Sequence, residues 1–239
     1  FSRGLKCSSM YDAYWSIAPI VIVLYWVFTA EEGVHPVRVG AVLFLVSWWG
    51  IRLTYNWARG WPGLHHVDWR YVEMEHKYPK VWFVTDLFGI HLFPTVQVLA
   101  ALSGAWVAVS QGTNGLNWID GLALIVTAGA IIIETVADQQ LVAFAKVKKP
   151  GEIIKTGLWA YSRHPNYFGE LSFWWGLYIF GLAANASYVW TIVGPIGMTA
   201  MFVGVSIPWM DQRSCERRPE YADHMKRVSG LVPWFPKKA

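Results

Sequence analysis

Apolar segments of membrane-spanning length follow one another along the chain, separated by short polar segments. An α-helix needs about 20 apolar residues to cross the roughly 30 Å of hydrocarbon in a bilayer. We predict six spanning helices on this pattern, over Asp12–Ala30, Val37–Trp57, Val81–Ser110, Trp118–Phe144, Leu171–Leu182 and Tyr188–Met210. The expected fold class is therefore all-α, a polytopic transmembrane helix bundle.

The last two helices come from one uncharged stretch. Leu171–Met210 contains no Asp, Glu, Lys or Arg and is too long for a single crossing. Small and polar residues at Ala183–Ser187 predict a tight turn within it. The helix before this turn is expected to begin somewhat before Leu171, inside a polar motif. The chain starts at Phe1 and not at Met, so a seventh helix upstream stays open.

The composition also indicates a membrane environment. The 239 residues are 54% hydrophobic and only 15% charged, against roughly 25% charged residues in ordinary soluble domains. Sixteen Trp and eleven Tyr suit the two membrane–water interfaces, where amphipathic rings concentrate. We expect a single transmembrane domain over residues 1–239, in which 145–170 and 211–239 form a cofactor-binding region on the cytoplasmic side.

Lys and Arg are distributed unevenly between the predicted loops. With six crossings, 18 of the 20 basic residues fall on one side of the bundle, and the opposite loops at 31–36, 111–117 and 183–187 have none. Because basic loops stay in the cytoplasm, we predict that both termini are cytoplasmic. The membrane is that of the endoplasmic reticulum, of another organelle, or the bacterial inner membrane.

The formal net charge of +4 follows from this basic face. It indicates anionic lipid headgroups or a phosphate-bearing cofactor as partners and requires no nucleic acid. The two cysteines, Cys7 and Cys215, are isolated in the sequence and both fall on the predicted cytoplasmic side. We therefore predict neither a disulfide nor a metal site.

Several ionisable residues fall at or near membrane depth, where they are costly. Glu134 and Asp138 are spaced to share one face of a helix. One reading makes each such residue half of a structural pair between helices, for example with Arg52, and the other makes it part of a site. Both readings stay open for single residues. Clustering near one membrane surface favours a site, and the residues concerned are Asp12, Arg52, Asp86, Asp138, His164 and Glu170.

The motif at 157–170 adds donors suited to a phosphorylated ligand. Arg163 is able to bind a phosphate bidentately, and His164 and Asn166 are further donors. Pro165 precedes a predicted helix whose free amide groups would face the ligand. The aromatic residues Trp159, Tyr161 and Tyr167 are either stacking platforms for a nucleotide or interfacial anchors, and the sequence leaves this open.

A resemblance to a known family rests on four segments: Gly157–Glu170, Glu134–Gln140, Arg218–Tyr221 and Val232–Pro236. Together they resemble the DUF1295 family of membrane proteins, which belongs to the steroid 5-alpha-reductase C-terminal-domain superfamily. Tyr11–Ser16 and His66–Tyr71 match further family segments, so the resemblance extends over almost the entire chain.

The resemblance implies an all-helical bundle that holds NADPH on its cytoplasmic side. It further implies reduction of a carbon–carbon double bond in a lipid-soluble enone or steroid-like substrate, at the bilayer surface where a water-soluble cofactor and a lipid-soluble acceptor meet. By motif, the residues implied to line the NADPH site are Asp138, Gln140, Arg163, His164, Asn166, Tyr167, Glu170, Arg213 and Tyr221.

The chain departs from the steroid reductases at the proton donor. In that family a Tyr, supported by an intramembrane Glu, binds the substrate carbonyl, and the corresponding position here is Trp49, whose indole is no proton donor. Helix 37–57 contains no acid, and Val67 stands where Glu is expected. Tyr55 and Tyr71 are the alternative donors, and the catalytic acid stays unassigned.

Two other functions remain in view. Isoprenylcysteine and phospholipid methyltransferases are similar to this superfamily but bind S-adenosylmethionine and usually carry paired glutamates in their C-terminal segment. The corresponding Met210–Glu216 here has no adjacent acids, which favours a reductase. The third possibility is a non-catalytic membrane subunit that keeps the fold, with or without a bound nucleotide, in a complex with other membrane proteins.

Overall fold

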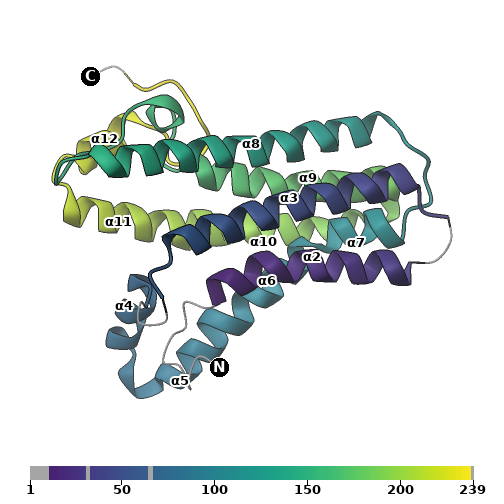
Figure 1. Cartoon of the computed structure of the whole chain (residues 1–239), viewed down its shortest axis with the longest axis horizontal. Coiled ribbons are helices and arrows are strands. Elements are labelled where there is room, and N and C mark those ends of the chain that lie inside the picture. The colour runs from purple at the N-terminus through teal and green to yellow at the C-terminus, as the bar shows by residue number, and fades with distance from the viewer. Residues whose placement is uncertain (1–10, 31–32, 64–66, 238–239) are drawn as a thin grey trace.

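The chain folds into a bundle of long helices (Figure 1). The computed structural model describes residues 11–30, 33–63 and 67–237, and this part contains helices and loops without a β-strand. Five helices in it are long and apolar enough to cross a membrane, namely Tyr11–Thr29, Pro36–Gly60, Pro79–Ala101, Trp118–Val147 and Ala186–Arg217. The protein is a multi-pass membrane protein, and the predicted all-α polytopic fold class is confirmed.

The predicted number of six spanning helices is wrong by one. The segment predicted as the fifth helix forms α9 (Pro165–Ala184), which starts inside the polar motif as expected but is not among the five. Of its 20 residues, 13 are buried. Because protein and not lipid surrounds most of α9, Glu170 is tolerated within it.

The long helices and the shorter segments joined to them have the following bounds: α2 (Tyr11–Thr29), α3 (Pro36–Gly60), α4 (Trp69–Lys77), α8 (Trp118–Val147), α10 (Val193–Met201), α11 (Ile207–Arg217) and α12 (Tyr221–Arg227). Short 3-10 segments occur at Pro79–Val81, Gly157–Ala160 and Ala186–Ile192, and a π-helical turn at Phe202–Ser206 joins α10 to α11. The predicted turn at Ala183–Ser187 coincides with the break between α9 and the segment that leads into α10.

The predicted helix over Val81–Ser110 is not continuous. It consists of α5 (Trp82–Val84), a π-helical segment (Thr85–Leu92), α6 (Phe93–Ala101) and α7 (Ser103–Ser110). Pro94, at the start of α6, has no amide proton to donate, which favours the irregular turn before it. Figure 1 shows α5 and α6 diverging from the bundle, whereas α7 lies within it.

Glycines permit close approach between the central helices. A side chain at Gly169 or Gly176 of α9 would overlap Glu134 or Thr127 of α8, and Gly104 of α7 meets Gly181 of α9 backbone to backbone. In a bilayer, where lipid is as apolar as leucine, such small residues allow the van der Waals contacts that hold helices together. Helix α9 is therefore clamped between α8 and α7.

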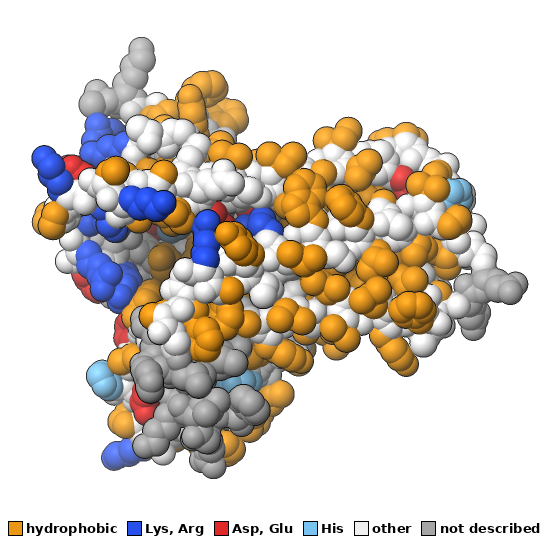
Figure 2. Space-filling model, in the orientation of Figure 1, with side chains coloured by type: hydrophobic (Ala, Val, Ile, Leu, Met, Phe, Trp, Pro, Cys, Tyr) orange, Lys and Arg blue, Asp and Glu red, His pale blue; other side chains and the backbone are white. Residues whose placement is uncertain are grey.

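Charged side chains gather at one end of the bundle (Figure 2). The ends of α3, α8 and α11 meet there, together with α4 and α12 (Figure 1). The assignment of this end to the cytoplasm stays a prediction, and Arg3, Lys6, Cys7 and Lys238 lie outside the described residues.

The opposite end contains a buried ion pair that the sequence did not predict. Arg38 of α3 donates to both carboxylate oxygens of Asp120 at the start of α8, at 2.7 and 2.9 Å. Its remaining donors bind the carbonyls of Asn114 and Gly115. This pair closes the loop between α7 and α8 onto α3.

Candidate functional site

A layer of charged side chains crosses the bundle near its basic end. Arg52 of α3 donates to Glu134 at 2.6 Å and to Asp138 at 2.8 Å, both on α8. Asn56, one turn further along α3, also donates to Asp138, at 2.7 Å. The two acids that the sequence placed on one helix face thus share a single guanidinium, which joins α3 to α8.

Glu170 of α9 extends this layer. Trp49 donates its indole N–H to one carboxylate oxygen at 3.0 Å, and Trp174 donates to the other at 2.8 Å. The Glu170 carboxyl also acts electrostatically on Glu134. Two carboxyl groups therefore bind the Arg52 guanidinium, and Glu170 adjoins them through Glu134. The Nε atom of Arg52 has no hydrogen-bond partner in the described part of the chain.

Trp49 has a structural position. Its side chain is 0% exposed, stacks on Phe173 with ring centroids 4.7 Å apart, and meets Trp15 and Trp174 edge to face. The indole fills the space beside Glu170 and occupies one of its oxygens. The position at which the resemblance implied a proton donor is thus closed by packing.

A second network centres on Asp211 of α11. This carboxylate accepts from Arg163 at 2.7 and 3.2 Å, from His164 at 2.9 Å and from Tyr221 at 2.8 Å. The remaining Arg163 donors bind the carbonyls of Met225 and Val228. Three predicted cofactor residues are thereby brought together, but by an acid that the sequence did not single out. The sequence feature that could have identified Asp211 is its place as the first charged residue after the uncharged 40-residue stretch.

The C-terminal segment docks on the same motif. The Arg163 amide donates to the Ser229 carbonyl at 2.9 Å, and the Trp234 amide donates to the Tyr161 carbonyl at 3.0 Å. The Ser162 hydroxyl donates to the Leu231 carbonyl at 2.7 Å. The two family-like segments, far apart in sequence, are therefore a single packed unit.

Gln140 and Trp159 support the turn that precedes the motif. The Gln140 side chain accepts from the Leu158 amide at 2.9 Å and lies against Gly157, whose φ of +60° favours glycine. The Trp159 indole donates to the Ala137 carbonyl at 3.0 Å. Gln140 and Trp159 therefore have these internal partners, and Trp159 is a buried anchor.

The first turn of α9 carries polar groups that the protein leaves available. Its N-cap His164 makes no side-chain capping bond, and the Asn166 side chain has no hydrogen-bond partner among the described residues. Tyr167 stacks on His164 with centroids 5.2 Å apart. The charges of Arg70 and Asp68 act on the Tyr167 hydroxyl, so α4 faces this turn.

Helix α4 brings more polar groups to this side. The Tyr71 hydroxyl donates to Asp12 at 2.7 Å, and burial, followed by the charge of Asp12, raises the pKa of Tyr71 well above its ordinary value. Arg213 of α11 lies 3.6 Å above the Trp69 ring and, like Tyr167, is within the electrostatic reach of Asp68.

The expected single cluster of ionisable residues is therefore divided. Asp138 and Glu170 lie in the Arg52 layer, His164 lies in the Asp211 network, and Asp12 binds Tyr71. Asp86 is 3.6 Å from His91, within the irregular segment before α6. Its separation follows from the break in the predicted third helix.

The two alternative proton donors differ in their surroundings. Tyr55 is 64% exposed on the outside of the bundle, with Arg59 over its ring. Tyr71 is buried and bound to a carboxylate. Of the two, only Tyr71 lies among the polar groups of the basic end.

Comparison with known proteins gives a family. The sequence model of the family described as "Protein of unknown function (DUF1295)" matches residues 1–228. An uncharacterised protein of Schizosaccharomyces pombe, C594.04c, is 27% identical over 252 residues, an alignment that covers 95% of this chain and 73% of the yeast protein. No solved structure matches the chain.

Proposed function

The chain belongs to the DUF1295 family, and from this membership and the polar contacts around α9 we propose that it is a membrane-embedded, NADPH-dependent reductase. Its substrate class would be a lipid-soluble enone or steroid-like molecule, reduced at a carbon–carbon double bond. The observation that carries the proposal is the uncapped first turn of α9, which lies beside cationic side chains and directly above the Arg52 layer.

The fit of a dinucleotide differs between the predicted residues. Asn166, Tyr167 and Arg213 have polar atoms without hydrogen-bond partners in the described part of the chain, and they suit direct contact. Free amides at a helix start and a guanidinium bind phosphate oxygens. Arg163 and Tyr221 already have internal partners. They suit a positioning role, in which they fix the start of α9.

The remaining predicted residues have corresponding roles. Gln140 would hold the turn before the motif. Asp138 would join α3 to α8, and Glu170 would join α3 to α9. His164 would support the Tyr167 ring by stacking on it. When bound, NADPH would supply the hydride. The protein would orient its ring and keep water from the acceptor.

Tyr71 is the side chain best suited to hold the proton that the reduced double bond needs. Its hydroxyl carries a proton at neutral pH, as any tyrosine does, and Asp12 accepts that proton in a hydrogen bond of 2.7 Å, so donation to a substrate would require the O–H to turn away from Asp12. One residue from Asp12, an apolar cavity of about 60 Å³ opens between α2 and α6. Tyr11, Trp15, Thr95 and Leu99 are among its lining residues. The cavity is apolar, but it is far smaller than the roughly 300 to 1,000 Å³ of a small-molecule site, so α2 and α6 would have to separate to admit the substrate.

Binding of NADPH, NADH and S-adenosylmethionine to the detergent-purified protein tests the proposal. We expect NADPH to bind most tightly. We expect Asn166→Ala and Arg213→Gln each to weaken it about tenfold, the effect of one lost hydrogen bond to a charged group. Arg217→Gln, on the exposed side of the same helix, is the matched control. Equal affinity for the three ligands, or equal losses in Arg213→Gln and Arg217→Gln, would refute the cofactor site.

A non-catalytic role is the second candidate, and the packing of Trp49 favours it. A fully buried indole that binds Glu170 stabilises the bundle without any ligand. Under this alternative, the unmodified protein and Asn166→Ala would bind NADPH with the same affinity, or neither would bind it. Extraction in mild detergent would recover the chain together with other membrane proteins.

A further inference from the structure

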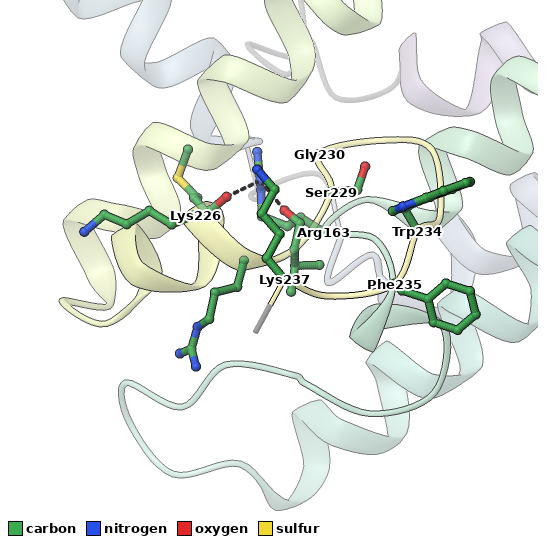
Figure 3. Close-up of a pocket in the computed structure, with 10 residues that line it drawn as sticks. Arg163, Lys226, Ser229, Gly230, Trp234, Phe235 and Lys237 are labelled. Carbon is green, nitrogen blue, oxygen red and sulfur yellow. Dashed lines mark hydrogen bonds between the residues drawn. The ribbon is translucent and has the colours of Figure 1, made fainter. Parts of the chain in front are cut away.

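A pocket in the C-terminal segment shares Arg163 with the predicted cofactor residues but includes none of the side chains assigned to direct NADPH contact. It has a volume of about 360 Å³ and is formed where α12 and the tail fold back over the motif (Figure 3). Figure 3 shows Arg163 at its centre, Lys226 on one side, and Trp234 and Phe235 on the other. Its lining residues are Arg163, Met225, Lys226, Arg227, Val228, Ser229, Gly230, Trp234, Phe235 and Lys237.

The pocket has more positive than negative charge. Arg163 is neutralised by Asp211, and Lys226 pairs with Asp223 at 2.7 Å. Arg227 and Lys237 have no ion-pair partner among the described residues. The pKa of His224 is lowered by burial and then by the charges of Lys155, Arg163 and Arg227, as expected where cations predominate.

A backbone hydrogen bond joins the two residues whose cations are unpaired. The Lys237 amide donates to the Arg227 carbonyl at 3.0 Å, so the end of the tail is fixed to the end of α12. The Trp234 amide is held by Tyr161, which fixes the other wall. Two basic side chains on adjoining backbone segments suit one phosphate group, which accepts several hydrogen bonds from different directions.

Exposed aromatic side chains distinguish this pocket from a site for a soluble anion. Trp234 is 70% exposed and Phe235 is 77% exposed, although the pocket lies at the basic end of a transmembrane bundle. Rings in such positions enter the interfacial region of a bilayer, where cations on the cytoplasmic leaflet meet anionic headgroups. The same few residues thus offer both components of a phospholipid-binding surface.

We propose that this pocket binds the phosphate of an anionic phospholipid from the surrounding leaflet. Arg227 and Lys237 contact the phosphate, and Trp234 and Phe235 lie between the headgroup and the acyl chains. The site is independent of the reductase proposal, because it uses none of the side chains assigned to direct NADPH contact.

Native mass spectrometry of the full chain in detergent tests the proposal, with short-chain phosphatidylglycerol as the probe and phosphatidylcholine as the zwitterionic reference. We expect phosphatidylglycerol to bind the unmodified protein at least tenfold more tightly than phosphatidylcholine. The double variant Arg227→Gln/Lys237→Gln should lose about tenfold in affinity. Lys146→Gln/Lys148→Gln, with the same change in net charge on exposed residues at the end of α8, should retain it.

Three outcomes would overturn the proposal. Equal losses in the two double variants would reduce the effect to net charge, and equal binding of the two lipids would remove the anionic headgroup from it. Displacement of the lipid by inorganic phosphate at equal concentration would assign the pocket to a soluble phosphate. Trp234→Ala/Phe235→Ala provides a further check, because it should weaken lipid binding and leave phosphate binding unchanged.

Discussion

At the scale of single residues, donors were easier to predict than their acceptors. The motif around Arg163 and His164 was recognised because several polar side chains occur together in the sequence. Asp211, which accepts from both, stands alone after an apolar stretch, and no periodicity links residues 48 positions apart. Trp49 was identified as unusual, but its bond to Glu170 depends on how three helices pack.

Asp211→Asn is expected to destabilise the protein strongly. The change leaves the buried Arg163 guanidinium without a counter-charge and weakens the bonds of His164 and Tyr221. Removal of one partner from a buried ion pair costs about 3 to 5 kcal/mol. Thermal unfolding in detergent, followed by tryptophan fluorescence, measures the effect. Glu216→Gln, at an exposed acid of the same helix, is the control and should shift the midpoint little.

His224 predicts a dependence of stability on pH. Burial, followed by neighbouring cations, lowers its pKa in the folded state, so the unfolded state binds a proton first as the pH falls. Above about pH 6.5, the pKa of His224 in the unfolded chain, His224 is neutral in both states and costs no stability. As the pH falls below that value, the unfolded chain takes up the proton first, and the free energy of unfolding decreases. We expect His224→Gln to lose less stability than the unmodified protein between about pH 7.5 and 5.5. His76→Gln, at an exposed histidine of α4, should follow the unmodified protein.

At the scale of elements, hydrophobic length predicted the outer helices better than the central one. The ends of α2, α3 and α8 lie within a few residues of their expected positions, since lipid requires continuous apolar helices there. Helix α9 satisfies its neighbours instead, and its tight contacts depend on glycines whose partners only the folded bundle brings near. The break between α6 and α7 was missed because each part is apolar on its own.

Gly176→Ala is expected to separate α9 from α8. Its new methyl group would overlap Thr127, and overpacking of this kind costs about 1 to 3 kcal/mol. Gly129→Ala in α8 is the matched control, because no other group lies within 4 Å of its added carbon. It should be neutral or stabilising, by at most about 1 kcal/mol. Equal destabilisation in both variants, measured by thermal unfolding, would contradict the clamp described for α9.

At the scale of the whole molecule, the alternation of basic and neutral loops predicted which segments meet at each end. It survives the error in the number of spanning helices because α9, although not among the five, still runs along the bundle (Figure 1). Charge counting uses only the order of segments along the chain, so it is insensitive to kinks and to errors in helix ends. The buried pair of Arg38 and Asp120 at the neutral end shows why counts fail for single residues, because a paired arginine inside the bundle carries no information about orientation.

The orientation itself is open to a direct measurement. We expect the basic end to face the cytoplasm, since Lys and Arg in short loops resist translocation. Single cysteines at Thr113→Cys, in the neutral loop before α8, and at Lys148→Cys, just after α8, both lie on exposed positions. In a background with Cys7 and Cys215 replaced by Ser, a membrane-impermeant maleimide applied to the cytoplasmic face of sealed membrane vesicles should label Lys148→Cys, and should label Thr113→Cys only after permeabilisation. The reverse pattern would place the proposed NADPH site on the side of the membrane without cytoplasmic NADPH, and the reductase proposal would fail with it.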